Sequence, residues 1–209
     1  MANNDGIYTM TTPATMTYSS LITPRAGTFN GKTGDPKFSV SMVFRPDDNE
    51  LKAMKVLCAD LARAKWPGGD LKLLKFPFRS GDATADKAKA TGKDQEFMRG
   101  FVELRASSKL EPELSGIVNG VFHVFTSQTR ATSKPLFYAG AQVLCELNFV
   151  PFTGNDGSGI TCYLNKVFST GKGEKMGIGN MRTSAEAFKG YMGSMSMANP
   201  MPADSKIPF

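Results

Sequence analysis

The chain contains very little of the chemistry on which most enzymes depend. Among its 209 residues there is one histidine, His123, and the three cysteines, Cys58, Cys145 and Cys162, are far apart and show no CxxC spacing. Zinc sites draw on closely spaced histidine and cysteine ligands, and the sequence offers no such cluster. An odd number of scattered cysteines is typical of reduced thiols in a cytosolic protein. We therefore predict neither a metal site nor a disulfide framework.

Motifs for phosphate binding, covalent catalysis and membrane insertion are also missing. Two glycine-rich stretches, at 171–175 and 177–179, lack the Gly-Lys-Ser/Thr ending of a phosphate-binding loop. No nucleophile is accompanied by a base and an orienting group. No apolar run is long enough to cross a bilayer, and the first residues lack the pattern of a signal peptide. These absences predict a soluble intracellular protein with no catalytic residues, no cofactor and no membrane partner.

What the chain does contain is a moderate excess of positive charge on a globular composition. It has 25 Lys and Arg against 19 Asp and Glu, a net charge of +6, and 41% hydrophobic residues. A chain of this length can form one domain with a sizeable core. The charge favours a polyanionic partner but does not identify one.

Alternating apolar residues predict a mainly β fold. Phe38, Val40, Met42 and Phe44 recur at every second position, which predicts a strand that stops at Pro46. Gly140 is expected to allow a bend or bulge of the kind that small barrels need. A hairpin connection is expected at 154–159. Further strands are expected at 16–23, 97–109, 116–126, 136–150 and 160–168.

One helix is expected between residues 47 and 66. Asp47, with Glu50 three residues later, is a helix-entry signature, and apolar residues then recur at helical spacing as far as Trp66. Residues 77–94 are polar and are predicted to form a long mobile loop. Several strands around one helix fit a small closed or nearly closed barrel in residues 1–180. Residues 181–209, rich in Met, Ser, Gly, Ala and Pro, are predicted to form a flexible tail.

The segment 97–109 carries the clearest functional signal. Read as a strand, it has one ordinary core face, and its other face is aromatic and charged, with Phe97, Arg99, Phe101, Glu103 and Arg105. Rings stack on bases while cations follow phosphates, so this face indicates binding of single-stranded nucleic acid. Glu103 would repel phosphate. It therefore either holds an arginine in place or narrows the binding face.

Seven sequence blocks stand out when the chain is read in order. They are Thr-Pro-Arg-Ala at 23–26, Pro-Lys-Phe-Ser-Val at 36–40, the helix ending at Trp66, Arg-Ser-Gly-Asp at 79–82, Arg-Ala-Ser-Ser-Lys at 105–109, Phe-Tyr-Ala-Gly-Ala-Gln-Val at 137–143 and Gly-Ile-Thr-Cys-Tyr-Leu-Asn-Lys-Val at 159–167. Together they resemble a known family, the enterophage-type single-stranded-DNA-binding proteins of tailed bacteriophages. The resemblance covers roughly residues 16–180. It implies an OB-fold and a role in protecting or organising single strands during phage DNA replication or recombination.

An OB-fold offers one sheet face as a platform for bases, which assigns expected roles to aromatic and basic residues. The residues expected to stack on bases are Phe97, Phe101 and Tyr138. The residues expected to contact phosphates are Arg99, Arg105 and Lys109. Further cationic candidates at strand ends or loops are Arg25, Lys37, Arg79 and Lys166.

The C-terminus carries a second resemblance. Bacterial single-stranded-DNA-binding proteins end in a run of acids followed by Ile-Pro-Phe, which docks into partner proteins. This chain ends in Ile207, Pro208 and Phe209, but Asp204 is the only nearby acid and Lys206 intrudes. The resemblance implies a peptide for replication or recombination proteins, because an apolar ring and a terminal carboxylate can fill a basic-rimmed pocket.

The leading hypothesis is a non-enzymatic single-stranded-DNA-binding protein in the cytoplasm of an infected bacterial host. One alternative is a virion or assembly protein that uses a β-barrel and a tail for protein contacts. Another is a nuclease or recombination enzyme, against which the lack of clustered acids and histidines counts. The sequence leaves open the binding-site size, binding of duplex DNA or RNA, and assembly into a homo-oligomer.

Overall fold

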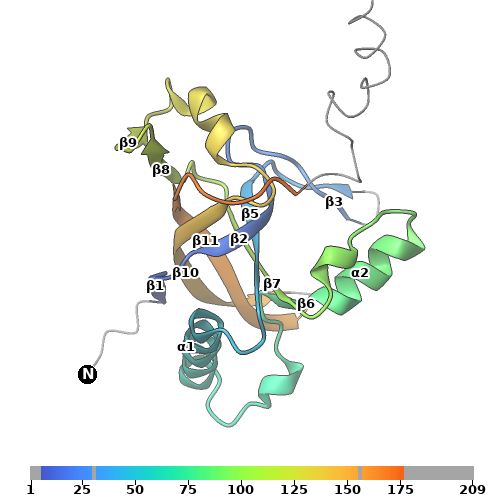
Figure 1. The fold of residues 1–209 in the computed structure, drawn as a ribbon. Coiled ribbons are helices and arrows are strands. Elements are labelled where there is room, and N and C mark those ends of the chain that lie inside the picture. The colour runs from blue at the N-terminus through green and yellow to red at the C-terminus, as the bar shows by residue number, and fades with distance from the viewer. Residues whose placement is uncertain (1–5, 30–31, 155–156, 177–209) are drawn as a thin grey trace, which may run out of the picture. The chain divides into compact units, whose positions relative to one another are not determined.

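The structure of the chain, a computed structural model, describes residues 6–29, 32–154 and 157–176. The predicted tail at 181–209, with Asp204, Ile207, Pro208 and Phe209, lies outside these residues. The described part folds as one large rolled sheet with helices around it (Figure 1). None of these helices is long and apolar enough to span a membrane, within the ranges described.

The sheet explains most of the sequence pattern. Its strands are β1 (Ile7–Thr9), β2 (Ala14–Ser19), β5 (Phe38–Phe44), β6 (Phe78–Ser80), β7 (Val102–Ser108), β8 (Glu113–Val118), β9 (Val121–Phe125), β10 (Gln142–Gly154) and β11 (Gly157–Ser169). They pair in the order β6-β7-β5-β2-β10-β11-β8-β9, and β1 joins β10. Neighbours are antiparallel except β8 and β11. A separate pair is formed by β3 (Thr28–Phe29) and β4 (Lys32–Thr33).

The sheet rolls up without closing. Strands β7 and β11 lie close to each other but do not pair. The core fills the roll, and Val143, Cys145, Leu147 and Phe149 on β10 are buried while the residues between them are half-buried. This alternation is typical of a strand with one face in the core, and it confirms a strand in the second half of the segment predicted at 136–150. The β10–β11 hairpin, with Gly154 opposite Gly157, confirms the predicted connection.

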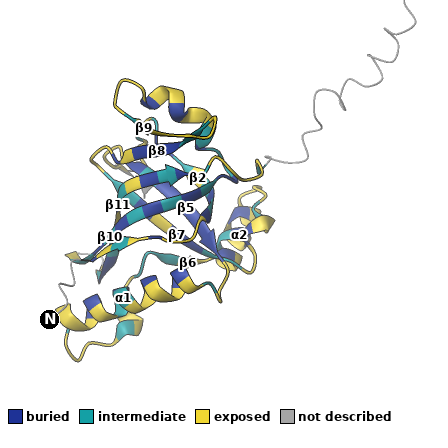
Figure 2. Cartoon of the chain, turned by 60° about the vertical axis from the view of Figure 1, so that its left-hand side comes forward, coloured by how far each residue is buried: buried dark blue, intermediate teal, exposed yellow. Residues whose placement is uncertain are grey.

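Helix α1 (Asn49–Lys65) packs against β10 and β11 at one end of the core. Its buried side faces the strands and its other side is exposed (Figure 2). The predicted helix is therefore confirmed, but its N-cap is Asp48 and not Asp47. The Asp48 carboxylate accepts hydrogen bonds from the backbone N–H groups of Glu50, at 2.8 Å, and Leu51, at 3.3 Å. These bonds satisfy donors that an uncapped helix leaves free.

Residues 77–94 are not a loop, and α1 is not the only helix. Strand β6 leads into helix α2 (Gly81–Ala90), with Ser80 as N-cap. The prediction failed because the buried residues of α2 are Gly81, Ala85 and Ala88. These side chains are too small to give the apolar stripe by which an amphipathic helix is recognised. The prediction of a single inserted helix is corrected accordingly.

The strand predicted from Phe97 starts only at Val102. Residues Glu96–Met98 form a short 3₁₀ helix, η2, and Gly100 has a φ of 74°, outside the β region. The chain therefore turns before β7 begins. Phe97 and Arg99 belong to this turn and do not share the strand with Arg105.

Other strand predictions hold with shifted limits. Residues 38–44 and 160–168 are strands as expected, and the first predicted strand is β2. Residues 116–126 form the β8–β9 hairpin around Asn119 and Gly120, whose φ angles are 51° and 79°. Like η2, two further 3₁₀ helices were not predicted: η1 (Leu71–Leu73) and η3 (Arg130–Leu136). Because β10 begins at Gln142, Tyr138 and Gly140 precede the strand in which they were expected.

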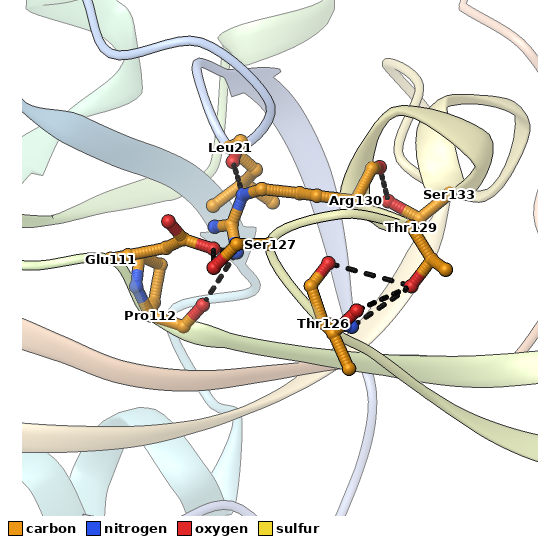
Figure 3. A network of polar contacts seen from close by, with 8 residues as sticks. All are labelled: Leu21, Glu111, Pro112, Thr126, Ser127, Thr129, Arg130 and Ser133. Carbon is orange, nitrogen blue, oxygen red and sulfur yellow. Dashed lines mark hydrogen bonds and ion pairs between the residues drawn. The ribbon is translucent and has the colours of Figure 1, made fainter.

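A buried arginine fixes the connection between β9 and β10 (Figure 3). Arg130 is 5% exposed, and its Nε donates to the Leu21 carbonyl at 2.7 Å. One terminal nitrogen donates to the Pro112 carbonyl and the Glu111 carboxylate, both at 2.9 Å. The guanidinium also lies 5.0 Å from the centre of the Phe38 ring. These contacts hold η3 against the segment that starts β8.

Candidate nucleic-acid interface

Four strands present a row of polar and aromatic side chains on the outer face of the sheet. Residues opposite each other in a ladder share a face, as do residues two apart on a strand. Arg79 lies opposite Glu103, and Arg105 lies opposite Ser41. Ser41 in turn lies opposite Tyr18. Strands β6, β7, β5 and β2 therefore place these residues side by side.

Tyr18 reaches this face because β2 contains a bulge. Met16 lies opposite Met42 and both are fully buried, so without a bulge Tyr18, two residues later, would also point into the core. The register shifts between Met16 and Tyr18, and Tyr18 instead becomes 47% exposed. Bulges re-aim side chains in this way, often next to functional sites. No alternation rule applied to the sequence would have found this residue.

Helix α2 and η2 cover one end of the same face. Val43, Ala85 and Met98 are buried together, with Phe101 packed against them. The backbone approaches closely here, because a Cβ on Gly81 would lie 1.9 Å from the Met98 carbonyl oxygen. The Gly81 N–H donates to the Phe101 carbonyl at 2.9 Å. These contacts fix α2 beside the exposed part of β7.

Two adjoining hollows lie on this face, one beside α2 and one beside η2, and they share Gln95 and Arg105; together we call them the α2 groove. The first, of about 630 Å³, lies along one stripe of α2. The second, of about 400 Å³, lies over β2 and β7. The first is lined by Arg79, Ser80, Ala83, Thr84, Lys87, Ala88, Thr91, Lys93, Gln95 and Arg105. The second is lined by Thr17, Tyr18, Gln95, Phe97, Met98, Glu103 and Arg105.

The first hollow is strongly basic. Arg79, Lys87, Lys93 and Arg105 line it, and no acidic residue does. Arg79, Lys87 and Lys93 are exposed and form no ion pair within the described ranges. Four cations that converge on one concave surface concentrate positive potential there.

Glu103, the single acid of the groove, is neutralised by Arg105. It is 2% exposed, and its Oε1 accepts a hydrogen bond from Arg105 Nε at 2.8 Å. This bond uses one edge of the guanidinium, which is half exposed, and leaves its terminal nitrogens free to meet an anion. Of the two hypotheses for Glu103, the geometry favours the one in which it holds an arginine in place. Its Oε2 has no hydrogen-bond partner among the described residues.

The second hollow is aromatic. Phe97 is 45% exposed and Tyr18 is 47% exposed, so both rings present a face to solvent. Sequence reasoning selected Phe97 but placed it on a strand, whereas η2 holds it at the rim. The groove thus combines Arg79, Arg105 and Phe97 from the predicted set with Tyr18, Lys87 and Lys93, which were not predicted.

Two other predicted residues of this region serve to attach α2. Arg99 donates to Glu96 at 2.5 Å and to Asp86 at 2.8 Å, which joins η2 to α2. Phe101 is half-buried in the Val43 cluster. Its ring contributes to packing, which is the role that an aromatic residue next to a sheet most often has.

A different hollow brings together Lys37 and Lys109. It has a volume of about 350 Å³, lies at the seam between β7 and β11, and is also lined by Tyr163, which is 46% exposed. Lys109 is ion-paired with Asp35. Arg25 is joined to Lys37 by backbone hydrogen bonds in both directions. This seam hollow is a second, less basic candidate surface.

Tyr138 and Lys166 line neither the α2 groove nor the seam hollow. The Tyr138 hydroxyl donates to the Gly173 carbonyl at 2.8 Å, and Lys175 lies 5.7 Å from its ring centre. Lys166 is ion-paired with Glu146 at 3.2 Å. The predicted set is therefore divided between the α2 groove, the seam hollow and isolated positions.

The described residues contain no group of three or more histidine, cysteine or acidic side chains that could hold a metal ion. His123 is exposed on β9. The α2 groove offers cations that can contact phosphates and exposed rings that can stack on flat bases.

The sequence matches one protein family over residues 8–198, the family described as the single-stranded-DNA-binding protein of Enterobacter phage Enc34. The chain belongs to this family. The match extends beyond both ends of the resemblance found from the sequence. No curated protein matches the sequence.

Solved structures confirm the fold. The single-stranded-DNA-binding protein from bacteriophage Enc34 in complex with ssDNA has a TM-score of 0.61 at 17% identity, over 82% of this chain and 90% of that chain. A second structure of the single-stranded-DNA-binding protein from bacteriophage Enc34 has a TM-score of 0.61 at 16% identity, over 86% of this chain and 88% of that chain. Its C-terminal truncation has a TM-score of 0.59 at 18% identity, over 82% and 88%. The predicted mainly β, OB-like class is thus confirmed, with a sheet that is not closed.

Proposed function

We propose that this protein binds single-stranded DNA in the α2 groove, without catalysis and with little sequence preference. It coats and protects single strands during phage DNA replication or recombination. One observation carries the proposal: a hollow with four cations adjoins a hollow with two exposed rings, and Arg105 belongs to both. Membership of a single-stranded-DNA-binding family supports it.

Each part of the groove has a separate task in this account. Arg79, Lys87 and Lys93 follow the phosphates, and binding releases the counterions condensed on the DNA. Phe97 and Tyr18 stack on neighbouring bases, which tolerates any sequence because every base has a flat face. Arg105, oriented by Glu103, contacts the phosphate between the two hollows.

The groove also accounts for a preference for single strands. In a duplex the bases are stacked and paired, so their faces are not available to rings at the surface of a protein. Phosphate contacts alone would remain, and these give only salt-sensitive, non-specific affinity. The aromatic hollow is therefore the source of discrimination between single-stranded and duplex DNA.

In this proposal the protein acts in the cytoplasm of the infected host, where it also binds protein partners. The terminal Ile207, Pro208 and Phe209, with Asp204, act as a docking peptide for replication or recombination proteins. Support comes from the similarity of this ending to those of bacterial single-stranded-DNA-binding proteins. A peptide ending in these residues should compete for the partner, and amidation of its terminal carboxylate should weaken it.

The proposal is tested by titrating labelled oligo-dT and a duplex of equal length with the protein at two salt concentrations. We expect tight binding to oligo-dT, weaker binding to the duplex, and a steep loss of both as salt rises. Absent or salt-insensitive binding to oligo-dT would refute the proposal. Degradation of the oligonucleotide with added divalent metal would refute its non-enzymatic part.

A further inference from the structure

The outer edge of the sheet at β9 is exposed and apolar. Val121, Phe122 and Val124 are 57%, 58% and 51% exposed, and among the described strands β9 pairs on one side only, with β8. From Leu114 to Thr129 the chain contains no Lys, Arg, Asp or Glu. Natural sheets usually protect an edge with charges, proline or a bulge, because unpaired backbone groups invite another strand. This edge has none of those protections.

The hairpin turn determines which N–H and C=O groups of β9 point away from β8 and can pair with another strand. Val118 and Val121 flank the two-residue turn at Asn119–Gly120 and are paired with each other. The residues that flank such a turn share hydrogen bonds, and hydrogen-bonded pairs then alternate along the strands. Val121, His123 and Phe125 therefore direct their N–H and C=O groups toward β8, and Phe122 and Val124 direct theirs outward.

The strand is self-complementary about its middle residue. If two copies of β9 pair antiparallel around His123, Phe122 of each copy lies opposite Val124 of the other, and Val121 lies opposite Phe125. Each outward-facing residue then meets an outward-facing residue, so the four hydrogen bonds of two narrow pairs can form. Aromatic residues opposite β-branched residues are favourable cross-strand pairs.

We propose that β9 is a two-fold interface with a second copy of this chain, in which the two sheets join edge to edge. Charge favours this occupant: each copy carries +6 overall, yet the joining strands are uncharged, so no like charges meet. DNA is a poor occupant because the strand offers no cation for phosphates. The hairpin is held firmly, since Glu111 and Pro112 before β8 are tied to Arg130 (Figure 3).

The size of the contact sets its strength. Five residues span about 17 Å at about 3.4 Å per residue. A stable interface usually buries about 800 Å² on each partner and involves about 20 residues a side. The β9 contact is smaller, so the free protein exchanges between monomer and dimer. Helix α2 lies away from β9 in both views (Figures 1 and 2), so the contact leaves the α2 groove open.

The register gives a direct test in the full-length chain. In a non-hydrogen-bonded pair the two His123 Cα atoms approach to about 4.5 Å, within the range that a disulfide can bridge. The two copies of Val121 are offset by four residues, about 13 Å along the strand, which is too far. The native thiols do not interfere, because Cys58, Cys145 and Cys162 are all buried.

We expect His123→Cys to form a covalent dimer under mild oxidation at least about ten-fold faster than Val121→Cys, because only the former meets disulfide geometry. Adding Val124→Lys to His123→Cys should slow covalent dimer formation to the rate of Val121→Cys. Adding Val124→Thr instead, a control that still favours a strand, should leave the fast rate of His123→Cys unchanged. Equal rates for the two cysteine variants would overturn the proposal. Failure of both thiols to react with a maleimide would also overturn it, because another segment would then cover β9.

Discussion

The two α-helices lie against the same sheet and both carry several lysines, but they use them differently. Helix α1 buries Leu51, Met54 and Cys58 in the core, and its Lys52 and Lys55 project from the opposite, exposed side. Helix α2 buries only small residues, and Lys87 lies on the stripe that faces the hollow with Arg79 and Arg105. Cations become a candidate site where they converge on a concave surface, and remain ordinary surface charges where they diverge.

The largest expected effect comes from removing the converging charges of the α2 groove. Each solvent-exposed ion pair with a phosphate contributes up to about 1 kcal/mol, so changing Arg79, Lys87 and Arg105 together to Ala should weaken oligo-dT binding by up to about 100-fold. The slope of log affinity against log salt should fall by about 2, because about 0.7 counterions per contact are no longer released from a single strand. Fluorescence anisotropy over a salt series measures both.

The matched control removes three charges from α1, by changing Lys52, Lys55 and Lys65 to Ala. These residues are also exposed, and the loss of net charge is the same. We expect affinity to change less than about threefold, since only the general field is reduced. Equal losses for the two triple variants would abolish the distinction between the helices.

The next effect in size comes from the rings beside the basic hollow. Phe97→Ala and Tyr18→Ala should each weaken binding by about 1–3 kcal/mol through lost base stacking. The salt slope should stay unchanged, because no ionic contact is removed. Tyr163→Ala, in the seam hollow, is the control and should have little effect. A larger loss of affinity for Tyr163→Ala than for Phe97→Ala and Tyr18→Ala would indicate that the DNA binds in the seam hollow.

A smaller and indirect effect is expected from Phe101→Ala. The ring is half-buried and helps attach α2, so its loss should lower the free energy of unfolding by about 1–2 kcal/mol. Urea denaturation measures the stability, and hydrogen exchange should show faster opening of α2. DNA affinity should fall only as far as α2 detaches. A large loss of affinity with unchanged stability would instead make Phe101 a stacking residue, as the sequence alone suggested.

The smallest effect on DNA binding is expected at Glu50, which does not line the α2 groove. This carboxylate is 5% exposed and accepts hydrogen bonds from the Tyr8 hydroxyl and from Thr11 and Thr12, which attach the N-terminal strand to α1. Burial alone would raise its pKa, but these bonds outweigh burial and lower the pKa from its ordinary 4.5. The ionised form is therefore the one that stabilises the fold.

The sign of the pH effect follows from that lowered pKa. The stabilisation is fully present above 4.5 and is lost as pH falls through the lower pKa of the folded state. Glu50→Gln should cost about 1–3 kcal/mol at pH 7. The difference from the wild type should shrink in acid, where Glu50 itself becomes protonated. Denaturant titrations at pH 7 and pH 3 measure this, and a constant difference would contradict it.

The mainly β class and helix α1 could be predicted from the sequence, because their large apolar residues recur at strand or helix spacing. Strand β10 and helix α1 bury long side chains at regular spacing, so local pattern and tertiary packing agree. Helix α2 could not be predicted in this way, because Gly81, Ala85 and Ala88 leave no apolar stripe. Its local signals were the Ser80 cap, the alanine-rich sequence, and the acid and lysines in its first and last turns.

The candidate site was only partly predictable for the same reason. Arg105 and Phe97 were selected on the assumption of one continuous strand. The turn at Gly100 instead places Phe97 in η2 and Arg105 on β7. Tyr18 depends on a bulge, and a bulge reverses the facing of every residue after it. Residue types indicated the kind of ligand, whereas their grouping depended on the tertiary fold.

The most direct test is to irradiate the complex of the full-length protein with oligo-dT and identify the crosslinked residues by mass spectrometry. Bases that stack on rings are held in contact with them, so the account predicts crosslinks to Tyr18 and Phe97. Crosslinks to Tyr163 or Tyr138, with none to Tyr18 or Phe97, would contradict it.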